Sequence, residues 1–159
     1  MAIQIETTFQ LEGYIDSQIG GRSENQDSAG AIETPIGTVA VVCDGMGGMN
    51  GGKVASMLAV QTIIDDVAKA QINDDPKEVL INAFLHAQKD ILSTASSDTE
   101  LNGMGTTATA IIISKEYATN NNVHIINVPR NPTKLRLASA TLRSDNSIFN
   151  FIYISSVQA

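Results

Sequence analysis

The sequence has 159 residues, of which 43 % are hydrophobic and 17 % charged, a size and balance typical of one globular domain. The formal net charge of −7 argues against nucleic-acid binding, because an acidic surface repels the phosphate backbone. The single cysteine, Cys43, excludes a disulfide within the chain and favours a reducing compartment. The first ten residues lack the pattern of a signal peptide, and no apolar stretch is long enough to span a membrane. We therefore expect a cytoplasmic protein with no membrane partner.

The first predicted elements are strands. Apolar and polar residues roughly alternate over residues 9–19, which indicates a half-buried strand. Residues 28–33 and 38–44 are predicted to form two more strands around a turn at residues 34–37, where proline and glycine supply the turn geometry. Residues 39–43 are apolar throughout, so this part of the second strand is expected to be buried on both faces.

Two helices and two further strands are predicted next. Residues 45–52 contain five glycines and are expected to form a loop, after which apolar residues recur at helical spacing. The second helix has a clear predicted start, with Asp75 as the capping residue and Pro76 at the first helical position. Residues 106–113 and 123–128 indicate strands. This order of elements predicts an α+β domain with helices packed on a sheet.

Three segments at predicted strand ends and loops could carry chemistry: residues 21–27, 44–48 and 103–108. Asp44 ends an apolar strand, and Gly45 has no side chain to shield its own carbonyl oxygen. A carboxylate beside a bare carbonyl is a pair of hard oxygen donors, suited to Mg²⁺ or Mn²⁺ rather than Zn²⁺. The alternative is that Asp44 only starts a turn, which is the commonest use of an Asp-Gly pair.

Arg22 and Asp27 are similarly open to two interpretations. Asp27 could cap a turn and Arg22 could be a solvated surface charge. A guanidinium group is, however, well suited to bidentate contact with a phosphate. With Asp44, these residues could therefore form a site for a metal ion and a phosphate.

Together, and in this order, the three segments resemble the opening motifs of the PPM family, the metal-dependent 2C-type serine/threonine protein phosphatases. Bacterial members carry Arg-x-x-Asn-x-Asp, then Asp-Gly-Met-Gly-Gly, then Gly-Thr-Thr, and all three motifs are present at residues 22–27, 44–48 and 105–107. The resemblance is clearest over residues 13–128. It implies an antiparallel β-sandwich flanked by helices, with a two-metal centre holding Mg²⁺ or Mn²⁺ at one edge.

The resemblance also implies roles for individual residues. Asp44 would bridge both metals, and Gly45 would offer its carbonyl oxygen to one of them. Asp27 would bind a metal or its water, and Arg22 would hold the substrate phosphate, so that Arg22 and Asp44 are the expected catalytic residues. The implied reaction is direct hydrolysis of a phosphate ester by a metal-activated water. The threonines at residues 106–107 are expected to be structural.

The sequence also departs from the family pattern. Gln26 stands where other members have Glu, and Met46 stands where some eukaryotic relatives have a His proposed as general acid. Residues 129–132 read Pro-Arg-Asn-Pro in place of Gly-Asp-Ser-Arg. Residues 145–150 resemble the family's Asp-His-Ser segment or, alternatively, its terminal Asp-Asn motif, in which case Asp145 would bind metal.

The family's later Asp-Gly and Asp-Asn segments have no counterpart in the sequence. We therefore expect residues 1–159 to form a single, C-terminally incomplete phosphatase domain. Two divalent ions bring four positive charges, whereas Asp27 and Asp44 supply only two negative ones. Missing strands would leave unpaired sheet edges, which could favour a homodimer.

Three functional interpretations stay open at this point. The first is metal-dependent hydrolysis of phosphoserine or phosphothreonine in proteins, with a substrate made by a serine/threonine kinase. The second is a catalytically inactive phosphatase-like module that binds a phosphoprotein or has a regulatory role. The third is a decayed gene product without a stable function.

Overall fold

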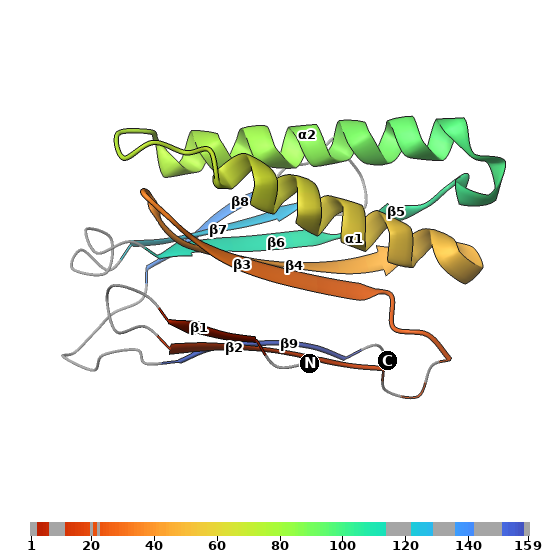
Figure 1. Ribbon diagram of the computed structural model, residues 1–159, viewed down its shortest axis with the longest axis horizontal. Helices are drawn as coiled ribbons and strands as arrows, with labels where there is room; N and C mark the ends of the chain where they lie inside the picture. The colour runs from red at the N-terminus through yellow and green to blue at the C-terminus, as the bar shows by residue number, and fades with distance from the viewer. Residues whose placement is uncertain are drawn as a thin grey trace.

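The protein consists of two stacked β-sheets with two long helices on the outer face of the larger sheet (Figure 1). The computed structural model describes residues 3–6, 12–19, 21, 23–113, 122–128, 136–141 and 151–157. The larger sheet has the strand order β3-β4-β6-β7-β8, with β5 paired to β4, and the smaller sheet has the order β1-β2-β9. The expected fold class, an α+β sandwich flanked by helices, is confirmed.

The described elements follow one another as strands, two helices and strands. In chain order they are β1 (Ile3–Glu6), β2 (Glu12–Gln18), β3 (Asp27–Thr34), β4 (Gly37–Met46), α1 (Gly48–Val67), α2 (Pro76–Ser97), the 3₁₀ helix η1 (Thr99–Leu101), β5 (Gly105–Thr106), β6 (Ala108–Ile113), β7 (Asn122–Val128), β8 (Arg136–Thr141) and β9 (Phe151–Val157). The described strand pairs are antiparallel except β2 with β9, which is parallel. That one pair departs from the expected antiparallel sandwich.

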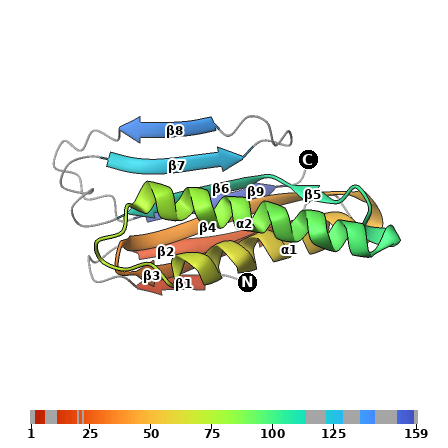
Figure 2. The same ribbon diagram turned by 90° about the horizontal axis from the view of Figure 1, so that it is seen from above.

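The core lies between the larger sheet and the helices. Side chains alternate between the faces of a strand, and Val39, Val41 and Cys43 of β4 are completely buried on the helix side. They pack in one cluster with Ile63 of α1 and Leu80 of α2. Figure 2 shows the two helices side by side above the sheet. Burying this apolar surface fixes the helix layer on one face of the sheet and leaves the opposite face to the smaller sheet.

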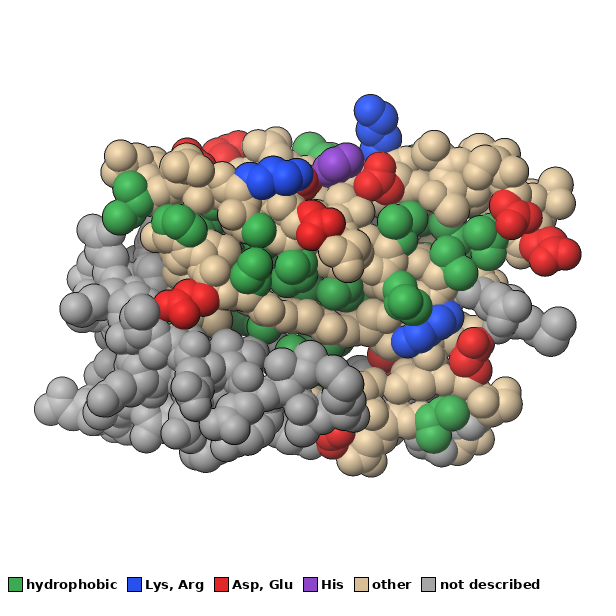
Figure 3. All heavy atoms as spheres, in the orientation of Figure 1, with side chains coloured by type: hydrophobic (Ala, Val, Ile, Leu, Met, Phe, Trp, Pro, Cys, Tyr) green, Lys and Arg blue, Asp and Glu red, His purple; other side chains and the backbone are tan. Residues whose placement is uncertain are grey.

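Apolar side chains also lie at the side of the molecule, where β3 packs against α1. Ile32 of β3 and Val60 and Ile64 of α1 are partly buried and pack against the core cluster. Figure 3 shows a band of hydrophobic side chains along the middle of this face, between the helix layer and the sheets. Gly30 lies under α1, where a Cβ atom would come within 2.8 Å of Val60 Cγ1, so its lack of a side chain lets β3 and α1 approach each other.

The predicted loop at residues 45–52 is wrong. Strand β4 continues to Met46 and α1 begins at Gly48, so the glycines lie in the end of a strand and the first turns of a helix. A Cβ atom on Gly45 would lie 2.0 Å from the carbonyl oxygen of Gly52, and one on Gly52 would lie 2.8 Å from the carbonyl carbon of Gly45. Glycine is needed here because the two backbones touch, which composition alone does not reveal.

The predicted start of α2 is confirmed. Asp75 caps the helix, its carboxylate accepting a hydrogen bond of 2.9 Å from the backbone N–H of Lys77, and Pro76 is the first helical residue. Among the described helices, none has both the length and the apolar character needed to cross a bilayer.

Candidate metal centre

Asp27 and Asp44 lie directly opposite each other in the larger sheet. Asp27 begins β3, Asp44 lies near the end of β4, and the antiparallel register pairs them. In such a pair the two Cβ atoms are about 5 Å apart and the side chains project from the same face of the sheet. Two carboxylates that are 17 positions apart in the sequence are therefore brought together by the β3–β4 hairpin.

The carboxylate pair lies on the face of the sheet opposite the helices. The residues next to the pair along the strands, Cys43 and Ser28, face the helix layer: Cys43 is in the core cluster, and the Ser28 hydroxyl lies 2.9 Å from that of Ser56 on α1. By alternation, Asp27 and Asp44 face the side on which the smaller sheet lies (Figure 1). Asp27 is buried, with 4 % of its surface exposed, whereas Asp44 is exposed.

The segment after η1 fixes the backbone of Asp44. The Asp44 carbonyl oxygen accepts hydrogen bonds of 2.9 Å from the Thr107 N–H and from the Thr106 hydroxyl. The Asp44 N–H donates to the Thr107 hydroxyl oxygen at 3.2 Å. This agrees with the structural role predicted for the two threonines. Their contacts restrict the conformation of Asp44 and so the direction in which its carboxylate projects.

The first turns of α1 fix the start of β3. The Gln26 carbonyl oxygen accepts hydrogen bonds from the Ser56 hydroxyl, at 2.6 Å, and from the Gly45 N–H, at 3.2 Å. The Lys53 ammonium group donates to the Asp27 carbonyl oxygen at 3.0 Å. Strand β4 and helix α1 thus both bind the residues that place Asp27.

Lys53 and Ser56 are site residues that the sequence analysis missed. Ser56 is fully buried, and it lies one helical turn from the buried apolar Ala59. A hydroxyl on the apolar face of a predicted helix could have indicated this role. A hydroxyl that is buried away from water needs a hydrogen-bond partner within the protein. The signal indicates that a partner exists but does not identify it.

The donor set fits one hard divalent ion. Carboxylates directly opposite each other repel unless a cation lies between or near them, and the two oxygen donors of the pair, with the Gly45 carbonyl, are of the kind that Mg²⁺ and Mn²⁺ prefer. Within the part of the chain that the structure describes, no group of three or more His, Cys, Asp or Glu side chains is placed to hold a metal. Two carboxylates neutralise one divalent ion but not two.

Of the other residues that the sequence singles out, only some lie within the described part of the structure. Arg22, the predicted phosphate ligand, lies outside the described residues, as do residues 129–132 and 145–150. Gln26, at the position of a family Glu, has its side-chain oxygen against Gly52 of α1. His86 is exposed on α2, where its Nδ1 lies 2.6 Å from a carboxylate oxygen of Asp66.

Cys43 is unsuited to act as a nucleophile. It is completely buried in the core cluster, and burial raises the pKa of its thiol to about 12. At neutral pH the reactive thiolate is therefore disfavoured, and the burial of Cys43 agrees with the buried strand predicted at residues 39–43.

Comparison with known families identifies the family of the fold that carries the facing carboxylates. The model of the protein phosphatase 2C family matches residues 16–124, more than half of the chain, and this match includes β3, β4, both helices and the threonine segment. The chain belongs to the protein phosphatase 2C family. The resemblance inferred from the motifs is thereby confirmed.

Named relatives and solved structures agree with this membership. The serine/threonine phosphatase stp of Listeria welshimeri is 34 % identical over 106 residues, which are 64 % of this chain and 42 % of that protein. The chain thus spans less than half the length of this curated relative. The catalytic domain of the serine/threonine protein phosphatase PstP, solved in complex with two manganese ions, has 27 % identity and a TM-score of 0.58, with coverage of 71 % of this chain and 45 % of that one.

A third comparison supports the same 2C-type fold. The structure of the serine/threonine phosphatase Stp1 from Staphylococcus aureus has 25 % identity and a TM-score of 0.61, and the match covers 70 % of this chain and 43 % of that one. Mixed helices and antiparallel strands are therefore arranged here as in solved phosphatases of the 2C type.

Proposed function

We propose that this protein catalyses the metal-dependent hydrolysis of phosphoserine and phosphothreonine in proteins. The observation that carries the proposal is the facing pair Asp27 and Asp44 in a member of the protein phosphatase 2C family. The named relatives are serine/threonine phosphatases, and one of them was solved with two manganese ions, which supports Mg²⁺ or Mn²⁺ as the cofactor.

Asp27, Asp44 and the Gly45 carbonyl would hold the metal. When bound, a divalent ion of this kind neutralises charge on the phosphoryl oxygens and activates water for attack. Asp44 is positioned for this task by the hydrogen bonds from Thr106 and Thr107. A ligand that is fixed before the metal arrives loses less conformational entropy when it binds.

Two basic residues would assist the metal site, one by binding the substrate phosphate and the other by offsetting negative charge. By resemblance, Arg22 would bind the phosphate through its guanidinium group. Lys53, whose ammonium group is held at the Asp27 carbonyl, brings a positive charge to the start of β3, which would lower the repulsion between the two carboxylates. The remaining negative charge that a second metal needs has to come from residues other than the described ones.

In the cell, we propose a cytoplasmic protein whose phosphoprotein substrates are made by a serine/threonine kinase. The single buried Cys43, which needs no oxidising compartment, supports this location. A homodimer that covers unpaired strand edges is part of the same proposal.

The proposal is tested by hydrolysis of p-nitrophenyl phosphate and of a phosphothreonine peptide, with and without Mn²⁺. We expect Mn²⁺-dependent turnover that falls at least about 100-fold in Asp44→Asn, because one anionic metal ligand is lost. Asp65→Asn is the matched control, since Asp65 is an exposed carboxylate on α1 away from the pair, and it should leave turnover unchanged.

Metal binding is measured separately by isothermal titration calorimetry. Asp44→Asn and Asp27→Asn should each weaken the binding of Mn²⁺, and Asp65→Asn should not. A folded protein that binds Mn²⁺ through this pair but shows no turnover would overturn the catalytic proposal and assign a non-catalytic role. Equal Mn²⁺ binding by all the variants would contradict the proposed metal site at Asp27 and Asp44.

A further inference from the structure

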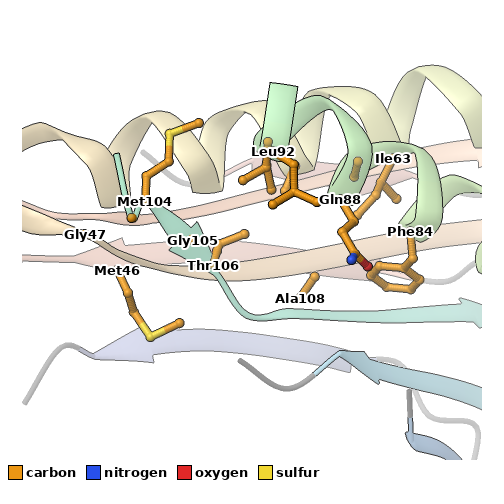
Figure 4. Close-up of a pocket in the computed structure, with 14 residues that line it drawn as sticks. Met46, Gly47, Ile63, Phe84, Gln88, Leu92, Met104, Gly105, Thr106 and Ala108 are labelled. Atoms are coloured by element: carbon orange, nitrogen blue, oxygen red, sulfur yellow. The ribbon is translucent and has the colours of Figure 1, made fainter. Parts of the chain in front are cut away.

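A cavity of about 300 Å³ lies between α2 and the sheet, on the helix side of β5 and β6. Its walls include Phe84, Gln88, Leu92, Met104, Thr106 and Ala108. In Figure 4, Phe84 and Gln88 extend from α2 toward the sheet, and Met104 lies at the other end, beside Gly47. Because Ala108 belongs to the core cluster on the helix face, the cavity and the carboxylate pair lie on opposite faces of the same sheet.

The chemistry of the walls defines the class of ligand. Fourteen residues line the cavity, none of them is charged, and most are apolar. Two lining side chains are polar, and the Thr106 hydroxyl is already used in a hydrogen bond to the Asp44 carbonyl oxygen. The side-chain amide of Gln88 makes no hydrogen bond within the described part of the chain, and Figure 4 shows it beside the Phe84 ring. An apolar cavity with one amide that can still donate and accept suits a neutral molecule with an apolar body and one polar group.

The dimensions agree with this class. An apolar cavity of about 150 Å³ is enough to bind benzene, so a cavity of about 300 Å³ has room for an aromatic ring and a polar substituent. Met104 contributes a flexible wall that can adapt to different ring shapes. Leu92 is 59 % exposed, which leaves the cavity open to solvent on that side.

The cavity also touches the segments that fix the metal centre. Thr106 lines it and donates to the Asp44 carbonyl oxygen at 2.9 Å. Gly47, which follows β4, lies so close to Met104 that a Cβ atom on it would be 2.7 Å from the Met104 Cα. A molecule that pushes on Met104 or Thr106 therefore acts on residues that directly contact the start of α1 and the backbone of Asp44.

We infer that this cavity is a binding site for a small, neutral, largely apolar molecule with one amide-like or hydroxyl group, and that its occupation changes the surroundings of Asp44. Binding to the cavity does not depend on the proposed function. An effect on phosphatase activity does rest on that function. By linkage, a ligand that changes the affinity for metal has its own affinity changed by the metal in the same ratio.

The test uses benzamide as the probe, because it combines an aromatic ring with an amide. Titration of the ¹⁵N-labelled protein without metal is expected to give saturable shifts of the backbone signals of residues 104–108 and of α2, with an affinity of about millimolar for a ligand of this size. The amide signals of Asp44 and Gly45 should move along the same saturation curve.

Two variants on α2 separate specific binding from nonspecific binding. Gln88→Leu removes the amide in the cavity and should weaken benzamide binding several-fold. Asn82→Leu makes the same kind of change at an exposed position on α2 and should have no effect. Ala87→Leu fills part of the cavity, since Ala87 lines it, and should abolish binding if the spectrum confirms a folded protein.

The inference fails if benzamide gives no saturable shifts up to its solubility limit, or if Gln88→Leu and Asn82→Leu bind it equally. Saturable shifts that leave Asp44 and Gly45 unmoved would overturn the coupling to the metal centre. These outcomes need no turnover, so they are distinguishable from a failure of the phosphatase proposal.

Discussion

The two long helices begin in different ways. Helix α2 has a local start, with the Asp75 carboxylate capping the N–H of Lys77 and with Pro76 at the first position. Helix α1 begins after Gly47 without a side-chain cap and has no acidic residue in its first turn. What fixes α1 is contact with the rest of the fold: Gly52 packs on Gly45 of β4.

This difference matters for the candidate metal centre, because the helix that supports it is α1. The same first turns of α1 provide Lys53 and Ser56, which bind the backbone of residues 26 and 27. A helix whose start is fixed by local signals would form in the same way on many sheets. The contacts that fix the start of α1 form only when β3 and β4 pair in the right register. The helix, the hairpin and the carboxylate pair are therefore expected to assemble together.

The largest expected effect is that of Gly45→Ala, which breaks the tertiary start of α1. A methyl group at this position would lie 2.0 Å from the Gly52 carbonyl oxygen and 2.6 Å from that of Gln26, so backbone has to move. We expect the free energy of unfolding to fall by about 3 kcal/mol or more. Urea denaturation followed by far-UV circular dichroism measures it.

Gly105→Ala is the matched control for this prediction. Gly105 also lies in a strand paired with the end of β4, but a Cβ atom there would have no atom within 4 Å. Its effect should stay within about 1 kcal/mol. If both variants unfold at the same urea concentration, the close contact between β4 and α1 is not what requires glycine at residue 45.

The contrast between the helices also explains how much of the fold could be predicted. The start of α2 is encoded within a few residues, and the sequence analysis identified Asp75 and Pro76 correctly. The glycines of residues 45–52 were misinterpreted as a loop, because glycine is needed there for close contact between the backbones of β4 and α1, which composition does not reveal. The parallel pairing of β9 with β2 joins residues about 140 positions apart, and no local pattern specifies such a partner.

For the candidate site, the sequence motifs identified the pair but not its supports. Asp27 and Asp44 follow from the motifs and from their positions at strand ends, and the hairpin places them together. Lys53 and Ser56 were missed because each acts through a hydrogen bond to a backbone carbonyl, and any residue type can provide that acceptor. The role of Arg22 stays a prediction.

The second prediction removes the local start of α2. Asp75→Ala deletes the carboxylate that caps the helix, and we expect the free energy of unfolding to fall by about 1 kcal/mol. Thermal or urea denaturation measures the change. Asp75→Asn keeps a capping oxygen and should stay close to the wild-type stability. A loss of equal size in both variants would show that the charge of Asp75, rather than the cap, stabilises the helix.

The smallest expected effect concerns the charge that α1 brings to the carboxylate pair. Lys53→Met removes an ammonium group held 3.0 Å from the Asp27 carbonyl oxygen while keeping an unbranched side chain of similar size. A positive charge there opposes a dication bound by Asp27 and Asp44, so its removal should raise the affinity for Mn²⁺ by roughly threefold at low salt and by less at high salt.

Calorimetric titration with Mn²⁺ at two salt concentrations measures this change, with Lys77→Met on α2 as the control, because Lys77 is an exposed lysine away from the pair. The two roles of Lys53 predict opposite signs. If its charge matters most, the affinity rises in Lys53→Met alone and the rise shrinks with salt. If its hydrogen bond to β3 matters most, the affinity falls and the fall does not depend on salt. A fall would contradict the electrostatic role of Lys53 and would leave α1 as a purely structural support for Asp27.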